Sequence, residues 1–474
     1  MHYIQVGSEN CGVAMKARQQ EGKLRTNDRT HRLERDPIGE VQVPEAALYG
    51  VQTFRALDNF RISPLRIHPE LITAYAGIKK AAAEANMETG ELAHNIGHAI
   101  VLAAEEVISG RWRDQFDLDV FQAGAGTSYN MNMNEVIANR ALELLGHNRG
   151  DYGHIHPNDH VNKSQSTNDT MPTAMRIAAV RLLRQLASAL DRLATSFAEK
   201  SAEFAEIRKA GRTHLHDAVP MTLGEEFGGY ADNLRRALGR LQVVESALLE
   251  VPLGGTAIGT GANTHPNYAQ IAVRQLAQIT GLELRESKNR IQSTQSLGDF
   301  VALSGALRAF AIELSKIAND LRLLNSGPHT GFDEIELPAV QPGSSIMPGK
   351  VNPVMAEMIN MVCFHVIAQD VAVGLCAEAG QLELNVMMPY VAYSLLESME
   401  VMKNAARAFD EKCVRGIRVH AGRCADYAEQ SVGNAALHNK ELGFMGAAEL
   451  AKRAMETGKS IDELVAEEEG KTQF

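Results

Sequence analysis

The chain is poor in aromatic residues and in cysteine. Aromatic side chains make up 5% of the 474 residues, and tryptophan occurs once. Helix formers fill the long segments instead, which favours helices packed on helices over a β-rich core. The five cysteines are widely scattered, odd in number and without a Cys-x-x-Cys pair. This pattern predicts reduced, mostly buried thiols, with Cys11 the most exposed.

The chain also lacks an excess of positive charge and an uninterrupted apolar run. Its formal net charge of -11 argues against a nucleic-acid partner, so an anionic substrate has to be attracted locally. No stretch approaches the roughly 18 to 20 uninterrupted apolar residues of a membrane span. The start, MHYIQVGSEN, lacks the charged and apolar regions of a signal peptide. We therefore expect a cytoplasmic protein without a membrane partner.

Five long segments carry apolar side chains at steps of three and four, the pattern of amphipathic helices. Thr222 and Glu225 form a capping box at the start of the second segment. Each helix is too apolar on one face to stand alone, which predicts an all-α fold around a long bundle shared between subunits. The five apolar stripes begin at Leu183, at Phe227, at Leu303, after Pro353 and after Pro389.

Composition also suggests how the chain is divided. Residues 1–35 are polar and rich in both charge signs, so we expect a flexible extension without a core. An N-terminal domain is predicted for residues 36–165 and the long-helix bundle for residues 166–422. A small C-terminal domain is predicted for residues 423–474.

The stretch from Pro342 to Pro353, PGSSIMPGKVNP, cannot form a helix or a central strand. Its glycines let backbone amides approach an anion, Lys350 adds a positive charge, and Ser344 and Ser345 offer a donor and a possible proton acceptor. The apolar residues among them predict that the loop packs onto another part of the protein. An ordered turn with surface serines is the alternative.

Two further polar loops precede helices. Thr127 follows a Gly-rich turn and is expected just ahead of a helix that begins near Asn134, where free amides favour anions, although an ordinary capping turn fits equally well. Asn168 and Asp169 are the expected N-caps of the first long helix, with Pro172 in its first turn. This places Ser166, Thr167 and Asn168 at the positive end of that helix.

A fourth polar loop, GRTHLHDAVP from Gly211, is expected where the first long helix stops. Two other motifs invite a cofactor interpretation. His154, His156 and His160 resemble metal ligands, but Pro157 breaks helical spacing and no Cys or nearby Glu completes the set, so metal is the less favoured interpretation. The glycines of residues 252–264 follow a helix rather than a strand, which makes a nucleotide site unfavoured.

Together the loops GTSYNMNMNE, SQSTND, GRTHLHDAVP and GSSIMPGKVNP resemble the aspartase/fumarase superfamily, from about Leu48 to about Cys424. The segments NDLRLL and AEAGQL resemble the aspartase branch more than class II fumarases. This resemblance implies elimination of ammonia from L-aspartate to give fumarate, without a metal or organic cofactor. It also implies a second carboxylate-binding region at HPNDHVN. The five long amphipathic segments, whose polar loops one chain could not easily bring to a single point, predict a homotetramer with active sites built from several subunits. Beyond Cys424, AALHNKELGF departs from the family pattern.

The resemblance implies a role for each matched residue. Ser344 would be the base that removes the C3 proton, and Lys350 and Asn352 would hold the carboxylate on which negative charge grows. Thr213 and Ser345 would support Lys350 and Asn352. The other carboxylate would be held by Thr127, Ser166 and Thr167. The leaving amine would be faced by Asn168 and His214. A class II fumarase acting on malate, another substrate of the superfamily and a non-catalytic relative of the lens-crystallin kind are the alternatives.

Overall fold

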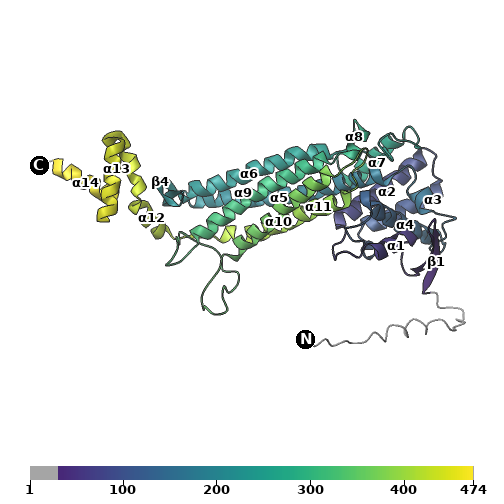
Figure 1. The fold of residues 1–474 in the computed structure, drawn as a ribbon, viewed down its shortest axis with the longest axis horizontal. Helices are drawn as coiled ribbons and strands as arrows, with labels where there is room; N and C mark the ends of the chain where they lie inside the picture. Colours follow the sequence, from purple (N-terminus) through teal and green to yellow (C-terminus); the bar gives the residue numbers. More distant parts are fainter. Residues whose placement is uncertain (1–29, 473–474) are drawn as a thin grey trace, which may run out of the picture.

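The structure is a computed structural model that describes residues 30–472. The molecule is elongated, with a long helical bundle between two smaller parts (Figure 1). The fold is mostly helical, as predicted, and its strands form four two-stranded sheets. Cys11 lies outside the described residues, and the predicted domain boundaries stay a prediction.

The N-terminal part begins with an antiparallel hairpin of β1 (His31–Asp36) and β2 (Gly39–Pro44). Residues 30–35, the described portion of the expected extension, are therefore not free of structure. Arg32 and Glu34 are buried and paired at 2.7 Å. The other elements are α1 (Val51–Asn59), α2 (Pro69–Glu88), α3 (His94–Ile108), η1 (Arg113–Gln115), η2 (Gly124–Gly126), α4 (Thr127–Leu144), the π-helix η3 (Pro157–Val161), α7 (Tyr268–Thr280) and α8 (Arg290–Gln295).

The central bundle contains the five long helices predicted from the apolar stripes, lying side by side in Figure 1. The helix α5 runs through it from the N-terminal part and packs against α6 and α11, while α10 packs against α9 and α11. The five helices are α5 (Thr167–Glu203), α6 (Leu223–Leu248), α9 (Gly298–Leu324), α10 (Val354–Glu378) and α11 (Met388–Lys412).

At the far end of the bundle a hairpin and a group of short helices close the structure. Strands β3 (Arg208–Thr213) and β4 (His216–Thr222) form the antiparallel hairpin between α5 and α6. A small separate apolar cluster that includes Leu450 and Ile461 holds the C-terminal helices together. The remaining elements are β5 (Glu250–Val251), β6 (Arg285–Glu286), β7 (Ile335–Glu336), η4 (Val414–Gly416), β8 (Arg418–Val419), α12 (Ala421–Gln430), η5 (Val432–His438), α13 (Asn439–Thr457) and α14 (Ile461–Thr472).

Two helix starts differ from the sequence expectation. The helix α4 begins at Thr127 rather than near Asn134, because its polar first turns are buried and apolar periodicity does not mark them. The N-cap of α5 is Ser166, not Asn168 or Asp169, and Pro172 lies inside the helix beyond its first turn. The capping box of Thr222 and Glu225 at α6 is confirmed by hydrogen bonds of 2.8 and 3.1 Å.

The helix α10 is unusually apolar for its exposure. Polar residues such as His365 and Gln369 interrupt the run, but the mean hydropathy of its best window is 1.6, high enough for a membrane span by length and composition. Only 28% of that window is buried, although α9 and α11 pack along the helix. Its outward apolar side chains are Met361, Phe364, Val371 and Leu375.

An aromatic cluster fixes three helices of the bundle. The ring of Phe197 on α5, fully buried, lies 6.0 Å from Phe227 and from Tyr230 on α6 and 6.5 Å from Phe409 on α11. Rings at such separations contribute beyond the area they bury. The free cysteines confirm the predicted thiols, since Cys363, Cys413 and Cys424 are buried and Cys376 half-buried.

We predict that Phe197→Ala lowers the free energy of unfolding by about 3–5 kcal/mol, because it opens a cavity where α5, α6 and α11 meet. The matched control is Phe444→Ala. Phe444 is 78% exposed, so loss of its ring should lower the free energy of unfolding by no more than about 0.5 kcal/mol. Thermal unfolding followed by circular dichroism measures both. Equal shifts in Tm would show that the cluster does not hold the bundle.

Candidate active site

The loop around Ser344 is irregular, as predicted, and it concentrates donors on one hydroxyl. The Ser344 Oγ accepts hydrogen bonds from the backbone amides of Ile346 at 3.2 Å and Met347 at 3.0 Å. Two amide dipoles aimed at one oxygen stabilise negative charge there, since they are oriented before any charge develops. The hydroxyl of Ser344 is therefore better suited to lose its proton than an ordinary surface serine.

Gly343 allows the loop to close on itself. Its amide donates to the Lys350 carbonyl at 2.8 Å, and its carbonyl accepts from Asn352 Nδ2 at 2.6 Å. A Cβ at residue 343 would lie 2.5 Å from the Lys350 carbonyl oxygen, so no larger residue fits without moving the loop. Ser344, Lys350 and Asn352 are thereby brought into one short turn.

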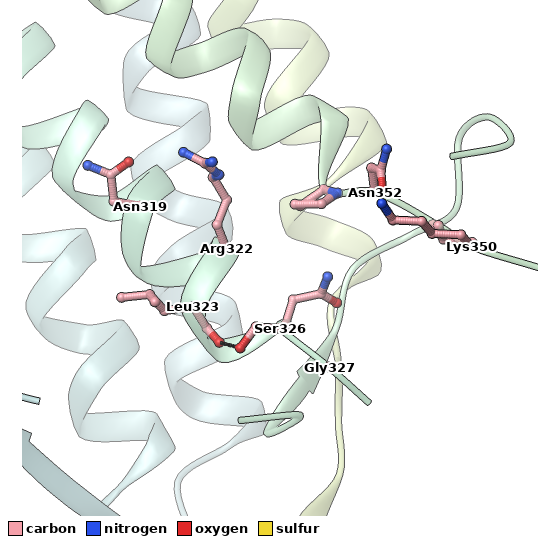
Figure 2. Close-up of a pocket in the computed structure, with 10 residues that line it drawn as sticks. Asn319, Arg322, Leu323, Ser326, Gly327, Lys350 and Asn352 are labelled. Atoms are coloured by element: carbon pink, nitrogen blue, oxygen red, sulfur yellow. Dashed lines mark hydrogen bonds between the residues drawn. The ribbon is translucent and has the colours of Figure 1, made fainter. Parts of the chain in front are cut away.

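A pocket of about 490 Å³ adjoins this turn. Lys350 and Asn352 line it from the loop, and Asn319 and Arg322 line it from α9 (Figure 2). The N-terminus of α10 follows Asn352 by two residues, which adds partial positive charge to the two side-chain cations. The chain as a whole is acidic and repels anions. This pocket nevertheless attracts an anion locally.

Within a single chain the loop's apolar side chains do not pack onto another element, so the expected packing of this loop stays a prediction. Ile346 is 83% exposed, and Met347 and Val351 are each 47% exposed. The physical reason is the position of the loop, which hangs away from the bundle between β7 and α10 (Figure 1). These side chains are available to another chain.

Thr213 and His214 lie at the tip of the β3–β4 hairpin. Thr213 pairs with His216, so His214 and Leu215 form a two-residue turn, and both have positive φ angles of 56° and 60°. Such turns normally use Asn or Gly, and bulkier residues in this conformation are strained. The hairpin thus exposes the His214 side chain in a strained backbone conformation, and contacts around the hairpin have to offset that strain.

A buried ion-pair network supports that hairpin. Glu334, fully buried, lies 2.9 Å from Arg212 Nη1 and 3.1 Å from Lys209 Nζ. The Arg212 guanidinium also stands 4.3 Å from the Phe332 ring and 5.2 Å from that of Tyr427. This network was not predicted from the sequence, in which Arg212 of the GRTHLHDAVP motif is its one visible member.

Thr127, Ser166, Thr167 and Asn168 occupy the N-termini of two helices in the N-terminal part. Thr127 is the first residue of α4 and lines a pocket of about 440 Å³. Ser166 caps α5 by accepting from the Asn168 amide at 3.1 Å. The helix dipole favours a carboxylate at both places, although amides such as those of Thr127 and Asn168 already donate within the chain.

Asp169 anchors the start of α5, a role that the sequence analysis did not assign. Its carboxyl group, fully buried, accepts from the amides of Ser166 at 2.9 Å, Gly254 at 3.1 Å and Thr256 at 2.9 Å. Burial raises the pKa of Asp169 to about 7. The Asn168 side chain donates to the Ala257 carbonyl at 2.8 Å and ties the same two loops together.

Lys79 holds the other side of the Ser166 loop. Its ammonium group is fully buried and donates to Asn130 at 2.7 Å, Asn162 at 3.0 Å and Gln165 at 2.9 Å. Burial lowers the pKa of Lys79 to about 7. Three side-chain amide oxygens therefore solvate the Lys79 ammonium group in place of water. Because one of them belongs to Gln165, the Ser166 loop is held directly against Lys79.

The structure does not bring the predicted residues together in one chain. The 37 residues of α5 span about 55 Å at 1.5 Å per residue. Residues 127 and 166–168 lie near the start of this helix, while the β3–β4 hairpin and the 343–352 loop lie near its other end (Figure 1). A site that uses both groups has to combine different subunits.

The histidines of HIHPNDH separate into different roles. His156 Nδ1 accepts from the amides of Asn158 and Asp159, and His160 Nδ1 accepts from the His156 amide at 2.8 Å. These two rings stabilise the short helix η3.

Comparisons with known proteins place the chain in a family. A profile of a lyase family matches residues 39–368. The aspartate ammonia-lyase of Bacillus subtilis (strain 168) is 48% identical over 92% of this chain and 91% of that protein. The aspartate ammonia-lyase of Escherichia coli (strain K12) is 47% identical over 92% of each chain.

Solved structures agree. A crystal structure of fumarate lyase:delta crystallin from Brucella melitensis bound to cobalt matches with a TM-score of 0.90 at 49% identity, covering 92% of this chain and 96% of that one. Recombinant class II fumarase from Schistosoma mansoni matches with a TM-score of 0.90 at 34% identity, over 92% and 95%. The chain belongs to this lyase family. Within the family it is a relative of the aspartate ammonia-lyases.

We predict that Asp169→Asn lowers the free energy of unfolding by about 1–3 kcal/mol, because an amide group turned toward three backbone donors leaves at least one of them unpaired. Glu225→Gln is the matched control. Glu225 has the same place in the capping box of α6 but is exposed, so its loss should cost less than about 1 kcal/mol. Differential scanning calorimetry compares the two, and equal shifts would remove the anchoring role.

Proposed function

We propose that the protein is a carbon–nitrogen lyase that converts L-aspartate reversibly to fumarate and ammonia. The proposal rests on the Ser344 hydroxyl, which accepts hydrogen bonds from two backbone amides. The same turn contains Lys350 and Asn352. The identity of 48% with an aspartate ammonia-lyase over 92% of this chain supports the choice of substrate.

The reaction begins with proton abstraction from C3 of aspartate. Ser344, as the alkoxide, takes the proton, and the C–H electron pair moves into an enediolate on the neighbouring carboxylate. A serine alkoxide is a costly species at neutral pH, and the amides of Ile346 and Met347 together with Lys350 have to offset roughly 3 to 7 kcal/mol of that cost. Lys350 and Asn352 stabilise the growing charge, and the loop amides are already aligned when it forms.

Collapse of the enediolate forms the C2–C3 double bond and breaks the C2–N bond. The amine leaves with its bonding electrons and becomes ammonia. Asn168 and His214 face this group, where a second cation is disfavoured because two unit charges about 4 Å apart repel by roughly 4 kcal/mol at an effective dielectric of 20. The second carboxylate is held by Thr127, Ser166 and Thr167, and the 343–352 loop is supported by Thr213 and Ser345.

The active protein is proposed to be a cytoplasmic homotetramer whose sites combine residues from several subunits. The length of α5 separates the two groups of site residues, so one chain cannot complete a site. The apolar outer side of α10 and the exposed side chains of the 343–352 loop offer surface for other copies.

Incubation with L-aspartate and, separately, with L-malate tests the function directly. Fumarate absorbs in the ultraviolet, so its release is followed continuously. We expect release from aspartate and none from malate. Release from malate alone would make the protein a fumarase, and release from neither would favour a non-catalytic relative or another substrate.

We predict that Ser344→Ala abolishes turnover but leaves substrate binding nearly unchanged, because a base acts on the chemical step. Ser345→Ala is the matched control in the same loop and should lose far less. Lys350→Ala should damage both kcat and KM, since it holds a carboxylate before and during the reaction. Steady-state kinetics measures all three, and more than about a tenth of wild-type turnover in Ser344→Ala would exclude this serine as the base.

Shared sites predict complementation between inactive variants. Thr167→Asp places a negative charge against the substrate carboxylate at one end of α5, and Ser344→Ala removes the base at the other. Co-expressed chains should regain activity, because about a quarter of the sites in random mixed assemblies combine the intact residue from each variant. Activity in a mixture no greater than the sum of the parents would show that each site is made by a single chain.

A further inference from the structure

His147, Asp151 and His154 form a cluster just beyond the C-terminal end of α4. The helix ends at Leu144. Gly146, with a φ of 80°, then turns the chain immediately before His147. A tight turn then carries Asp151 and His154 back beside His147. Among the described residues this is the one group of three such side chains whose ligand atoms all lie within 4.8 Å of one another.

The distances approach those of a metal site. An Asp151 carboxylate oxygen lies 3.9 Å from His147 Nδ1 and 3.8 Å from His154 Nε2. Ligands bound tetrahedrally at about 2.0–2.2 Å from an ion stand about 3.3–3.6 Å apart, so the cluster has to contract only slightly. Two imidazole nitrogens and one carboxylate oxygen suit zinc and its neighbours among the transition metals.

The two histidine side chains are free to adjust. Their rings stack with centroids 3.9 Å apart and an interplanar angle of 17°, so one ring has to turn before both lone pairs meet at one point. The side chains are 33% and 56% exposed, and neither has a hydrogen-bond partner among the described residues. Arg149, in the same turn, is paired with Glu143 at 2.6 Å, which limits its repulsion of a cation.

The neighbouring histidines do not share this freedom. His156 and His160 use their Nδ1 atoms to accept backbone amides in and around η3. Only His154 of the HIHPNDH motif keeps both ring nitrogens available, and its partner His147 lies outside the motif. The sequence pattern therefore suggested a different set of ligands from the one that the fold assembles.

We propose that His147, Asp151 and His154 form a binding site for a divalent transition-metal ion such as Zn²⁺, with water in the remaining positions. The 18 residues of α4 span about 27 Å, and Thr127 stands at the other end, so the ion is not part of the reaction within this chain. Bound there, it ties the end of α4 to the turn that leads into η3.

Calorimetric titration of the metal-free, untagged protein with Zn²⁺ tests the site. A second candidate pair, His94 and His98, is exposed and one helical turn apart on α3, so His98→Ala serves as the common background. In that background we expect one Zn²⁺ per chain. His147→Ala and His154→Ala should each weaken binding at least about tenfold, as loss of one of three ligands requires. Aspartate turnover should not change.

Electron paramagnetic resonance with Cu²⁺ identifies the ligands independently. Coupling to two imidazole nitrogens should appear in the His98→Ala protein and fall to one in either histidine variant. The proposal is overturned if His98→Ala alone removes Zn²⁺ binding, if His147→Ala and His154→Ala leave the affinity unchanged, or if the Cu²⁺ signal lacks two nitrogens. Circular dichroism confirms that each variant is folded.

Discussion

The length and stiffness of α5 constrain the whole molecule. A helix of 37 residues keeps its two ends about 55 Å apart, and the candidate site residues lie at both ends. At one end lie the N-termini of α4 and α5, and at the other Lys350 and Asn352 lie just before the N-terminus of α10. An acidic chain thereby gains two separate places of positive potential, each suited to one carboxylate of a dicarboxylate substrate.

Buried charged groups hold each of these places in shape. Asp169 and Lys79 fix the Ser166 loop, while Glu334, Lys209 and Arg212 fix the hairpin that carries His214. Burying such groups costs free energy unless every partner is in position. The loops consequently have few alternative arrangements, so the donors of the candidate site are held in position without a ligand.

The sequence predicted the repeating parts of the fold well and the local irregularities poorly. Apolar steps of three and four located all five long helices because packing decides those positions. The start of α4 was misplaced because residues such as Asn130 and Asn134 are polar yet buried. The N-cap of α5 was shifted because Asp169 serves as the third residue of a capping box and also binds a distant loop.

The candidate site was predicted as a set of residues shared between subunits, but not which residues lie at which end of α5. The motifs contain both groups of site residues. Their sequences do not indicate that the length of α5 separates one group from the other. The β3–β4 hairpin escaped prediction because its turn uses His214 and Leu215 where Asn or Gly is usual. Arg212 and Glu334, far apart in sequence, could be paired only by the fold.

The apolar outer side of α10 has a consequence for how the protein is made. A newly folded single chain exposes Met361, Phe364, Val371 and Leu375 to water. In the proposed homotetramer, assembly and non-specific aggregation compete for this surface, and both speed up as the chain becomes more concentrated. Under the proposed assembly, the rate at which the chain is synthesised therefore affects the yield of active protein.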